Sequence, residues 1–173
     1  MSVAGLVLGI IATALAVASL TWQVVLRLPG PRPQLTPVVG LLTPGGLVTT
    51  DGSRDAREFL LPAAGQWVGQ LIVGVKVVNV ARAPLRVADW AIRTDPESMS
   101  LAPAPIGGTE IPRDIPPRAS AVFVTKLENA QRFAEAAARV DGAPPQIVLT
   151  VSSGSRSYVT KPVAPELLSL EPR

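Results

Sequence analysis

The sequence predicts a mainly β protein: an antiparallel immunoglobulin-like β-sandwich with one short inserted helix, preceded by an N-terminal transmembrane helix. Three observations support this prediction. Residues 3–26 form an apolar run without a charged side chain. About seven short segments of β-forming residues follow, separated by turn signals. A single stretch with helical spacing, residues 129–142, interrupts them.

The first 26 residues are expected to be a transmembrane anchor that contacts the lipid bilayer through residues 3–26. A helix of about 20 apolar residues crosses a hydrocarbon core of about 30 Å. Trp22 suits the membrane interface, and Arg27 is the first charged residue. The alternative is a cleaved signal peptide, because Ala16 and Ala18 have the spacing that signal peptidase accepts. The anchor is favoured, since no Lys or Arg precedes the apolar run and the run continues to Leu26.

The positive charges that flank this segment predict its orientation. Arg27 and Arg32 follow it and no cation precedes it, so the positive-inside rule places the C-terminal domain in the cytoplasm. Gly5 and Gly9 have the GxxxG spacing of helices that approach closely, which would allow a homodimer. Small residues are also common in Ala-rich membrane helices, and this is the simpler explanation.

Residues 27–33 are expected to be a stiff Pro/Arg spacer, and residues 34–163 the β-sandwich domain. The domain should open with extended segments at 35–42 and 47–50, joined by a Pro-Gly-Gly turn, and then a polar loop at 51–55.

The strongest strand signal covers residues 67–80. Leu71, Val73, Val75 and Val77 alternate onto one face, which is therefore expected to be core, whereas Lys76 points the other way. A short turn leads into residues 85–94, which also favour a strand. These two segments are interpreted as a hairpin.

The rest of the domain should contain an irregular, proline-rich connection at 103–117 and a strand at 119–127. Asn129 is expected to cap the helix, and Asp141-Gly142 to end it. Ala130, Phe133, Ala134, Ala137 and Val140 recur at helical spacing. Strands at 147–151 and 156–163 should follow, and residues 164–173 are expected to be a flexible tail.

Composition excludes several classes of chemistry. The chain of 173 residues has no cysteine and no histidine, so it lacks disulfides, thiolate metal sites and the usual general base at neutral pH. Its net charge is +3, but the arginines are scattered among the acidic residues without a run. This distribution argues against a nucleic-acid partner.

One loop begins like a calcium site. Asp51, Ser53 and Asp55 supply oxygens at the first, third and fifth positions of an EF-hand pattern. Ala56 then replaces the required glycine and Pro62 the required glutamate. A solvated loop is the favoured interpretation, and no metal or cofactor is expected.

No catalytic residue is expected either. Asp95 with Glu97, and Glu110 with Asp114, are close in sequence, but this does not show the separation that a glycosidase needs. Ser-Lys catalysis needs a desolvated lysine, and the chain's lysines stand singly in predicted strands: Lys76, Lys126 and Lys161.

Two tryptophans, Trp67 and Trp90, have two interpretations. Either residue would serve as an exposed anchor for a partner. Core packing is favoured, because the domain is poor in aromatic residues.

The order of these features, with a strand ending V-x-V-x-N before a basic turn with proline, resembles small single-pass membrane proteins of unknown function from high-GC bacteria and their phages. Residues 75–84 (VKVVNVARAP) carry the resemblance, and Ala81 stands where the pattern usually has glycine. The resemblance implies an immunoglobulin-like domain at a membrane and no catalytic residue.

The leading hypothesis is a membrane-tethered, non-enzymatic interaction domain that binds an unknown protein partner. Tethering concentrates a weak binder at a surface, so modest affinity suffices. The alternative is a structural or accessory protein of a phage or bacterial envelope, for example in a lysis or envelope-remodelling module. A third alternative, an exported lectin-like or calcium-dependent adhesin, requires the opposite membrane orientation.

Overall fold

The computed structural model describes residue 19 and residues 32–66, 69–96 and 99–170. The chain divides into two compact units, residues 1–32 and residues 33–173, and the second is the domain described below. Apart from Ser19 and Arg32 to Pro33, the predicted anchor and spacer lie outside the described residues, as do Gly5 and Gly9. Within the described ranges, no helix has both the length and the apolar character needed to cross a membrane.

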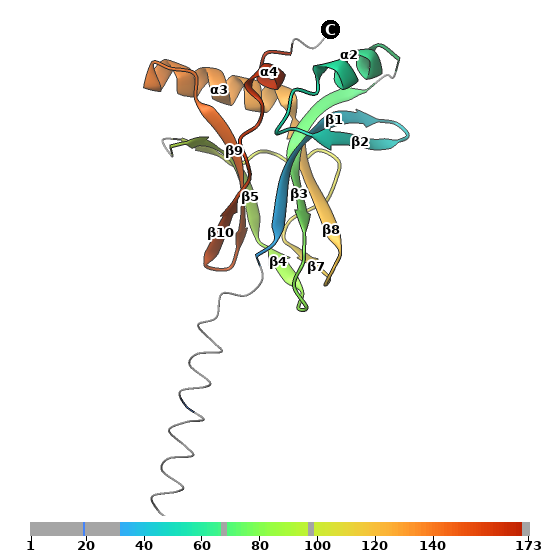
Figure 1. The fold of residues 1–173 in the computed structure, drawn as a ribbon, viewed down its shortest axis with the longest axis vertical. Coiled ribbons are helices and arrows are strands. Elements are labelled where there is room, and N and C mark those ends of the chain that lie inside the picture. The colour runs from blue at the N-terminus through green and yellow to red at the C-terminus, as the bar shows by residue number, and fades with distance from the viewer. Residues whose placement is uncertain (1–18, 20–31, 67–68, 97–98, 171–173) are drawn as a thin grey trace, which may run out of the picture. The chain divides into compact units, whose positions relative to one another are not determined.

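The domain is mainly β, with antiparallel sheets, as predicted (Figure 1). One four-stranded sheet has the order β2-β1-β3-β8, the other has the order β10-β9-β5-β6, and β4 pairs with β7. The strands are β1 (Gln34–Thr43), β2 (Gly46–Asp51), β3 (Gln70–Val78), β4 (Leu85–Val87), β5 (Asp89–Asp95), β6 (Ser100–Leu101), β7 (Arg113–Ile115), β8 (Ser120–Lys126), β9 (Gln146–Ser153) and β10 (Arg156–Val159). The helices are α2 (Arg57–Gln66), α3 (Leu127–Asp141) and α4 (Pro165–Leu168).

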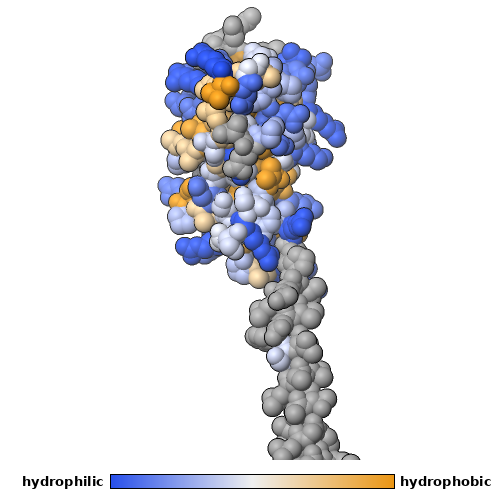
Figure 2. Space-filling view, turned by 90° about the vertical axis from the view of Figure 1, so that its left-hand side faces the viewer, coloured by the Kyte–Doolittle hydropathy of each residue, from blue (hydrophilic) through white to orange (hydrophobic). Residues whose placement is uncertain are grey.

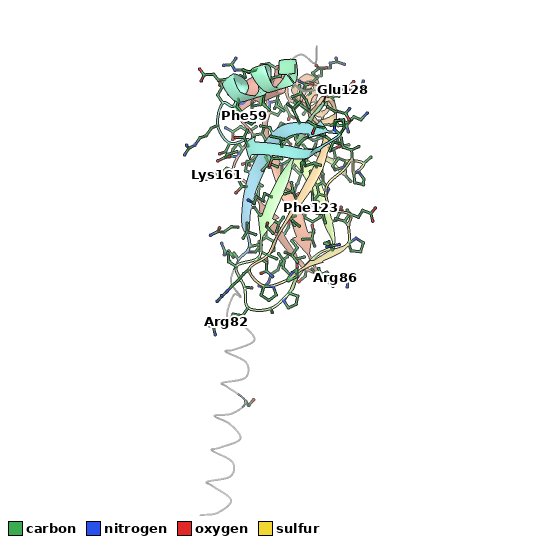
Figure 3. The ribbon with its side chains drawn as sticks, turned by 90° about the vertical axis from the view of Figure 1, so that its right-hand side faces the viewer. Phe59, Arg82, Arg86, Phe123, Glu128 and Lys161 are labelled. Carbon is green, nitrogen blue, oxygen red and sulfur yellow. The ribbon has the colours of Figure 1, made fainter. Side chains whose placement is uncertain are left out.

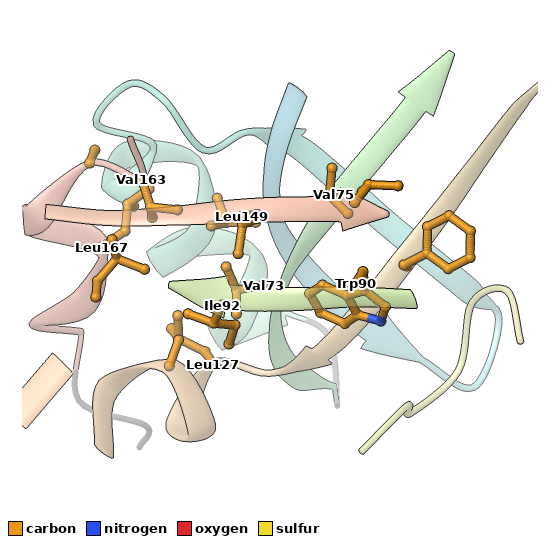
Figure 4. Close-up of a cluster of buried hydrophobic side chains, with 14 of the residues drawn as sticks. Val73, Val75, Trp90, Ile92, Leu127, Leu149, Val163 and Leu167 are labelled. Atoms are coloured by element: carbon orange, nitrogen blue, oxygen red, sulfur yellow. The ribbon is translucent and has the colours of Figure 1, made fainter. Parts of the chain in front are cut away.

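The two four-stranded sheets share one hydrophobic core. Val73 and Val75 of β3 meet Trp90 and Ile92 of β5 and Leu149 of β9 (Figure 4). The predicted core face of β3 is confirmed for its three valines, which are all fully buried, and Leu71 packs partly buried against the same cluster.

The opposite face of β3 is also partly covered, which the alternation did not predict. Ile72 is fully buried and Lys76 is exposed. The amides of Ile106 and Thr109 donate to the carbonyls of β8, so the proline-rich connection runs along the outer edge of that strand. This connection also brings Gly107 against the Leu42 side chain of β1.

The hairpin expected between residues 67–80 and 85–94 is wrong. β3 pairs with β1 and β8, whereas the second segment breaks at Ala88 into β4, which pairs with β7, and β5, which pairs with β9. Two short connections thus carry the chain from one sheet to the other. Trp67 lies outside the described residues.

Helix α3 begins earlier than predicted. Its first residue is Leu127, preceded by Lys126 without a side-chain cap, and Asn129 lies in the first turn, where its Nδ2 donates to Thr125 Oγ1. The predicted end is confirmed, because Gly142 adopts a left-handed conformation (φ 72°) and donates its amide to Ala138. Val140 was expected on the apolar face and is instead exposed.

Residues 164–173 were predicted to be a flexible tail, and the structure corrects this as far as residue 170. Helix α4 lies there, and Leu167 and Leu170 are buried in the common core. The amide of Ala164 donates to the carbonyl of Gly52, which fixes the start of this segment. Apolar contact with the core, rather than local helix propensity, orders so short a helix.

Candidate functional site

The loop that resembles the start of a calcium site satisfies its first carboxylate internally. Asp51 Oδ1 accepts hydrogen bonds from the amide of Ser53 at 2.9 Å and from its hydroxyl at 2.7 Å. Burial raises the pKa of the Asp51 carboxyl, but the bonds from Ser53 and the charges of Arg54 and Lys161 outweigh it and leave the pKa below its ordinary value. This carboxylate stabilises a turn.

The second carboxylate of this loop belongs to an ion pair. Arg57 donates to both oxygens of Asp55, with 2.7 Å between Nη2 and Oδ2, and these bonds lower the pKa of the exposed Asp55 carboxyl. Over the described part of the chain, no group of three or more acidic residues is placed to hold a metal ion.

Those of the other candidate carboxylates and lysines that the structure describes lie on separate elements. Asp95 ends β5, Glu97 lies outside the described residues, and Glu110 is exposed in a loop. Asp114 lies in β7 directly opposite Arg86 of β4. Lys76 and Lys161 are exposed, and Lys126 is half-buried before α3.

Trp90 takes the core role that was favoured for it. Only 2% of its surface is exposed, and it packs between the two sheets with Ile92 (Figure 4).

A buried asparagine organises the end of the domain at which β1 begins. Asn79, 1% exposed, follows β3, and its Nδ2 donates to the carbonyls of Ala83 and Ile115 at 2.9 Å and of Pro116 at 3.3 Å. Its Oδ1 accepts the amide of Ala81 at 3.0 Å.

The backbone of Asn79 joins the same network. Its amide donates to the carbonyl of Ala119, and its carbonyl accepts the amide of Arg118 at 2.8 Å. One residue therefore binds the turn after β3 to the segment between β7 and β8. The asparagine of the V-x-V-x-N pattern thus has a structural reason to be there.

Five exposed arginines lie at this end of the domain, which we call the basic end. Figure 3 shows Arg82 and Arg86 there. Arg113 pairs in register with Val87, next to Arg86. Arg118 contacts Asn79 through its backbone. The fifth, Arg156, lies in the β9–β10 hairpin, which the bond from the Ala88 amide to the Ser152 carbonyl holds beside β4.

The charge of the basic end is only partly balanced. Two carboxylates lie in strands at this end, Asp89 in β5 and Asp114 in β7. Glu110 and Lys76 lie farther from it, and their opposite charges cancel. None of the five arginines forms an ion pair with a described residue. The pair Asp55–Arg57 lies at the start of α2, and the pair Glu128–Arg132 lies on α3.

The opposite end carries the helices and an exposed aromatic residue. Phe59 of α2 is 46% exposed, and it lies with Glu128 at the end away from Arg82 (Figure 3). The other exposed large apolar residues, Val80, Val140 and Val159, belong to separate elements. The face drawn in Figure 2 is mainly hydrophilic and carries small, separate apolar areas.

Sequence reasoning missed the basic end, because its five arginines come from three separate stretches of chain between residues 82 and 156. Their scatter along the chain hides their common location. In comparisons with protein-family models, curated proteins and solved structures, nothing matches this chain. The resemblance carried by residues 75–84 therefore remains a prediction.

Proposed function

We propose that this chain is a single-pass membrane protein that presents a non-enzymatic interaction domain at a membrane surface. The observation that carries the proposal is the uncharged apolar run of residues 3–26, followed after the spacer of residues 27–33 by the first strand at Gln34. A domain joined so closely to a membrane-spanning segment stays near the bilayer. Its binding partner is a protein, and its role is recognition.

The proposed fold of this domain is an immunoglobulin-like sandwich. Two antiparallel four-stranded sheets on one core, with Trp90 buried between them, support this assignment. The absence of histidine and cysteine from the sequence supports a role in binding rather than catalysis. The proposed orientation places the domain in the cytoplasm, because Arg27 and Arg32 follow the apolar run.

Membrane extraction and a topology assay test the proposal. The full chain should stay with membranes after alkaline washing and dissolve only in detergent. Arg54→Cys, in the exposed loop after β2, introduces the chain's sole cysteine. An impermeant maleimide should label it only after the membrane is opened.

Two results would overturn the proposal. If the uncleaved chain is found in the soluble fraction, residues 3–26 are not a membrane anchor. If the maleimide labels intact cells, the domain lies on the outer side of the membrane and the proposed orientation is wrong. If the purified chain catalyses a reaction and no partner is recovered from native membranes, the protein is an enzyme and not an interaction domain.

A further inference from the structure

We propose that the basic end, Arg82, Arg86, Arg113, Arg118 and Arg156, docks on the anionic lipid headgroups of the membrane that holds the chain. This inference rests on the proposed function, because it takes residues 3–26 to be inserted in that membrane. It adds a second and separate lipid contact, made by the folded domain. It also defines which end of the domain is left for a protein partner.

The charge of the basic end fits an anionic surface. All five arginines are exposed, and none is held by a carboxylate in the ion pairs of the described residues. Asp89 and Asp114 offset only part of their charge. Guanidinium groups bind phosphate in planar, two-pronged geometry and remain charged at any physiological pH.

The basic end is also held in a fixed arrangement before any lipid binds. Asn79 ties the turn that carries Arg82 to the segment that carries Arg118, through hydrogen bonds of 2.8 to 3.3 Å. Pairing of β4 with β7 fixes the backbone of two more arginines, with Arg86 opposite Asp114 and Arg113 opposite Val87. Little conformational entropy is therefore lost in the backbone on docking.

The spacer of residues 27–33 joins the domain at the basic end. Gln34 of β1 pairs with Val78 of β3, so the chain enters the domain next to the turn that carries Arg82. About seven spacer residues, 27–33, span at most about 25 Å when fully extended. Within such a volume the effective concentration of lipid is high, and a weak attraction is sufficient.

Docking in this way turns the helical end toward the aqueous phase. Helices α2 and α3 carry the ion pairs and the exposed Phe59 (Figure 3). A protein partner would then meet these helices, and the lipid would meet the turns.

The test uses the full chain in lipid nanodiscs. Ser155→Cys, in the exposed β9–β10 turn, provides the sole site for a fluorescent donor, because the chain has no cysteine. An acceptor is attached to the lipid headgroups. Energy transfer should be higher in discs that contain phosphatidylglycerol than in discs of phosphatidylcholine alone. It should fall when NaCl is raised from ~0.1 to ~1 M, where the screening length drops from about 10 to about 3 Å.

The key variant combines Arg82→Gln, Arg86→Gln and Arg118→Gln. Each arginine near an anionic surface changes the ratio of docked to undocked domain about fivefold, so the triple change should lower this ratio on the order of a hundredfold. The matched control combines Arg57→Gln, Arg132→Gln and Arg139→Gln on the helices, and it should leave the transfer unchanged. Thermal unfolding measured by circular dichroism verifies that both variants are folded.

The outcomes separate this inference from the proposed function. If the chain is not retained in phosphatidylcholine discs, the anchor fails and the inference falls with it. If the chain is retained but transfer is the same in both lipids, or if both triple variants lose it equally, the function stands and docking by the basic end is wrong. A third outcome would assign the basic end to nucleic acid. In that case energy transfer does not depend on the lipid, the chain binds single-stranded RNA, and only the basic-end triple variant loses this binding.

Discussion

The side chain of Asn79 shows how much one residue contributes to this domain. Its carboxamide makes all four of its bonds to backbone groups, and two of the acceptors lie 36 and 37 residues away in sequence. The V-x-V-x-N pattern identified this position in the sequence. The distant acceptors, the carbonyls of Ile115 and Pro116, could not be predicted, because they reach Asn79 only when β7 lies beside the turn after β3. The sequence alone therefore indicates that Asn79 belongs to a turn, but not that it joins this turn to the segment after β7.

Replacing Asn79 with alanine should therefore be costly. The two N–H donors of Nδ2 and the acceptor Oδ1 are lost, and at about 1 kcal/mol for each of these three groups the free energy of unfolding should fall by about 3 kcal/mol. Urea unfolding of the full chain in detergent, followed by circular dichroism, measures this change. Asn129→Ala, which removes one bond to Thr125, is the control and should cost about 1 kcal/mol. Equal losses would show that Asn79 is not a link between the turns.

Adjacent residues of β3 allow a second test at this scale. Val75 is fully buried between β1 and β8, so Val75→Asp places a carboxylate without a partner in the core and should cost about 3 to 5 kcal/mol. Lys76 is exposed, and Lys76→Asp should change stability by about 0.5 kcal/mol or less. Thermal unfolding of the two variants compares the faces directly. Similar melting temperatures would contradict the burial of this strand.

At the level of elements, alternation located most strands and the glycine located the end of α3. Strand pairing was harder to predict, because the same apolar alternation is compatible with several neighbouring strands. β3 and the segment after it were predicted to form a hairpin. Instead, the chain leaves the first sheet at Asn79 and, after a break at Ala88, enters the second sheet as β5. Helix α2 was missed because Pro62 lies within it. Contact of Leu60 with the core stabilises it where the local sequence does not.

Close contact between strands makes one glycine of β3 irreplaceable. A Cβ on Gly74 would lie 2.0 Å from the carbonyl oxygen of Phe123 in β8, a backbone atom that cannot move without breaking the sheet. We expect Gly74→Ala to lower the free energy of unfolding by about 2 to 3 kcal/mol in urea titrations. Gly45→Ala, in the open turn after β1, should have an effect within about 0.5 kcal/mol. A tolerated Gly74→Ala would mean that β3 and β8 are farther apart.

The C-terminal helix provides a test of its own. A chain that stops after Val163 lacks Leu167 and Leu170, which are 0% and 7% exposed, and the bond from Gln131 Nε2 to the Leu170 carbonyl. Burying a leucine contributes about 1.5 to 3 kcal/mol, so this truncation should cost at least about 3 kcal/mol. A chain that stops after Leu170 serves as the control and should melt like the full chain. If both truncations melt alike, the segment after Val163 is a tail after all.

For the whole molecule, sequence patterning correctly predicted a mainly β domain with antiparallel sheets, but it did not predict the distribution of charge. Arg82 and Arg156 are far apart in the chain, and only the arrangement of β4 and β9 puts them at one end. Surface charge does not direct folding as apolar spacing does, so its pattern on the surface follows from the topology. The sequence shows these arginines at scattered positions, and only the fold shows that they lie at one end of the domain.

The domain should fold without the first unit. We expect residues 33–170, expressed alone, to be soluble and to give a circular dichroism spectrum dominated by β structure, since the sheets and their core lie within this range. A single cooperative melting transition should accompany it. A disordered or mainly helical spectrum would contradict the architecture described above.

The pairing of β5 with β9 has a consequence for biosynthesis. Trp90 lies opposite Val151, so the central pair of the second sheet cannot form until the ribosome has added roughly 60 further residues, which takes about 3 to 12 s. During that interval β5 can pair only with the short strand β6, and Trp90 has no partner strand. The second sheet, and the core that it shares with the first sheet, is therefore completed only after β9 has been synthesised.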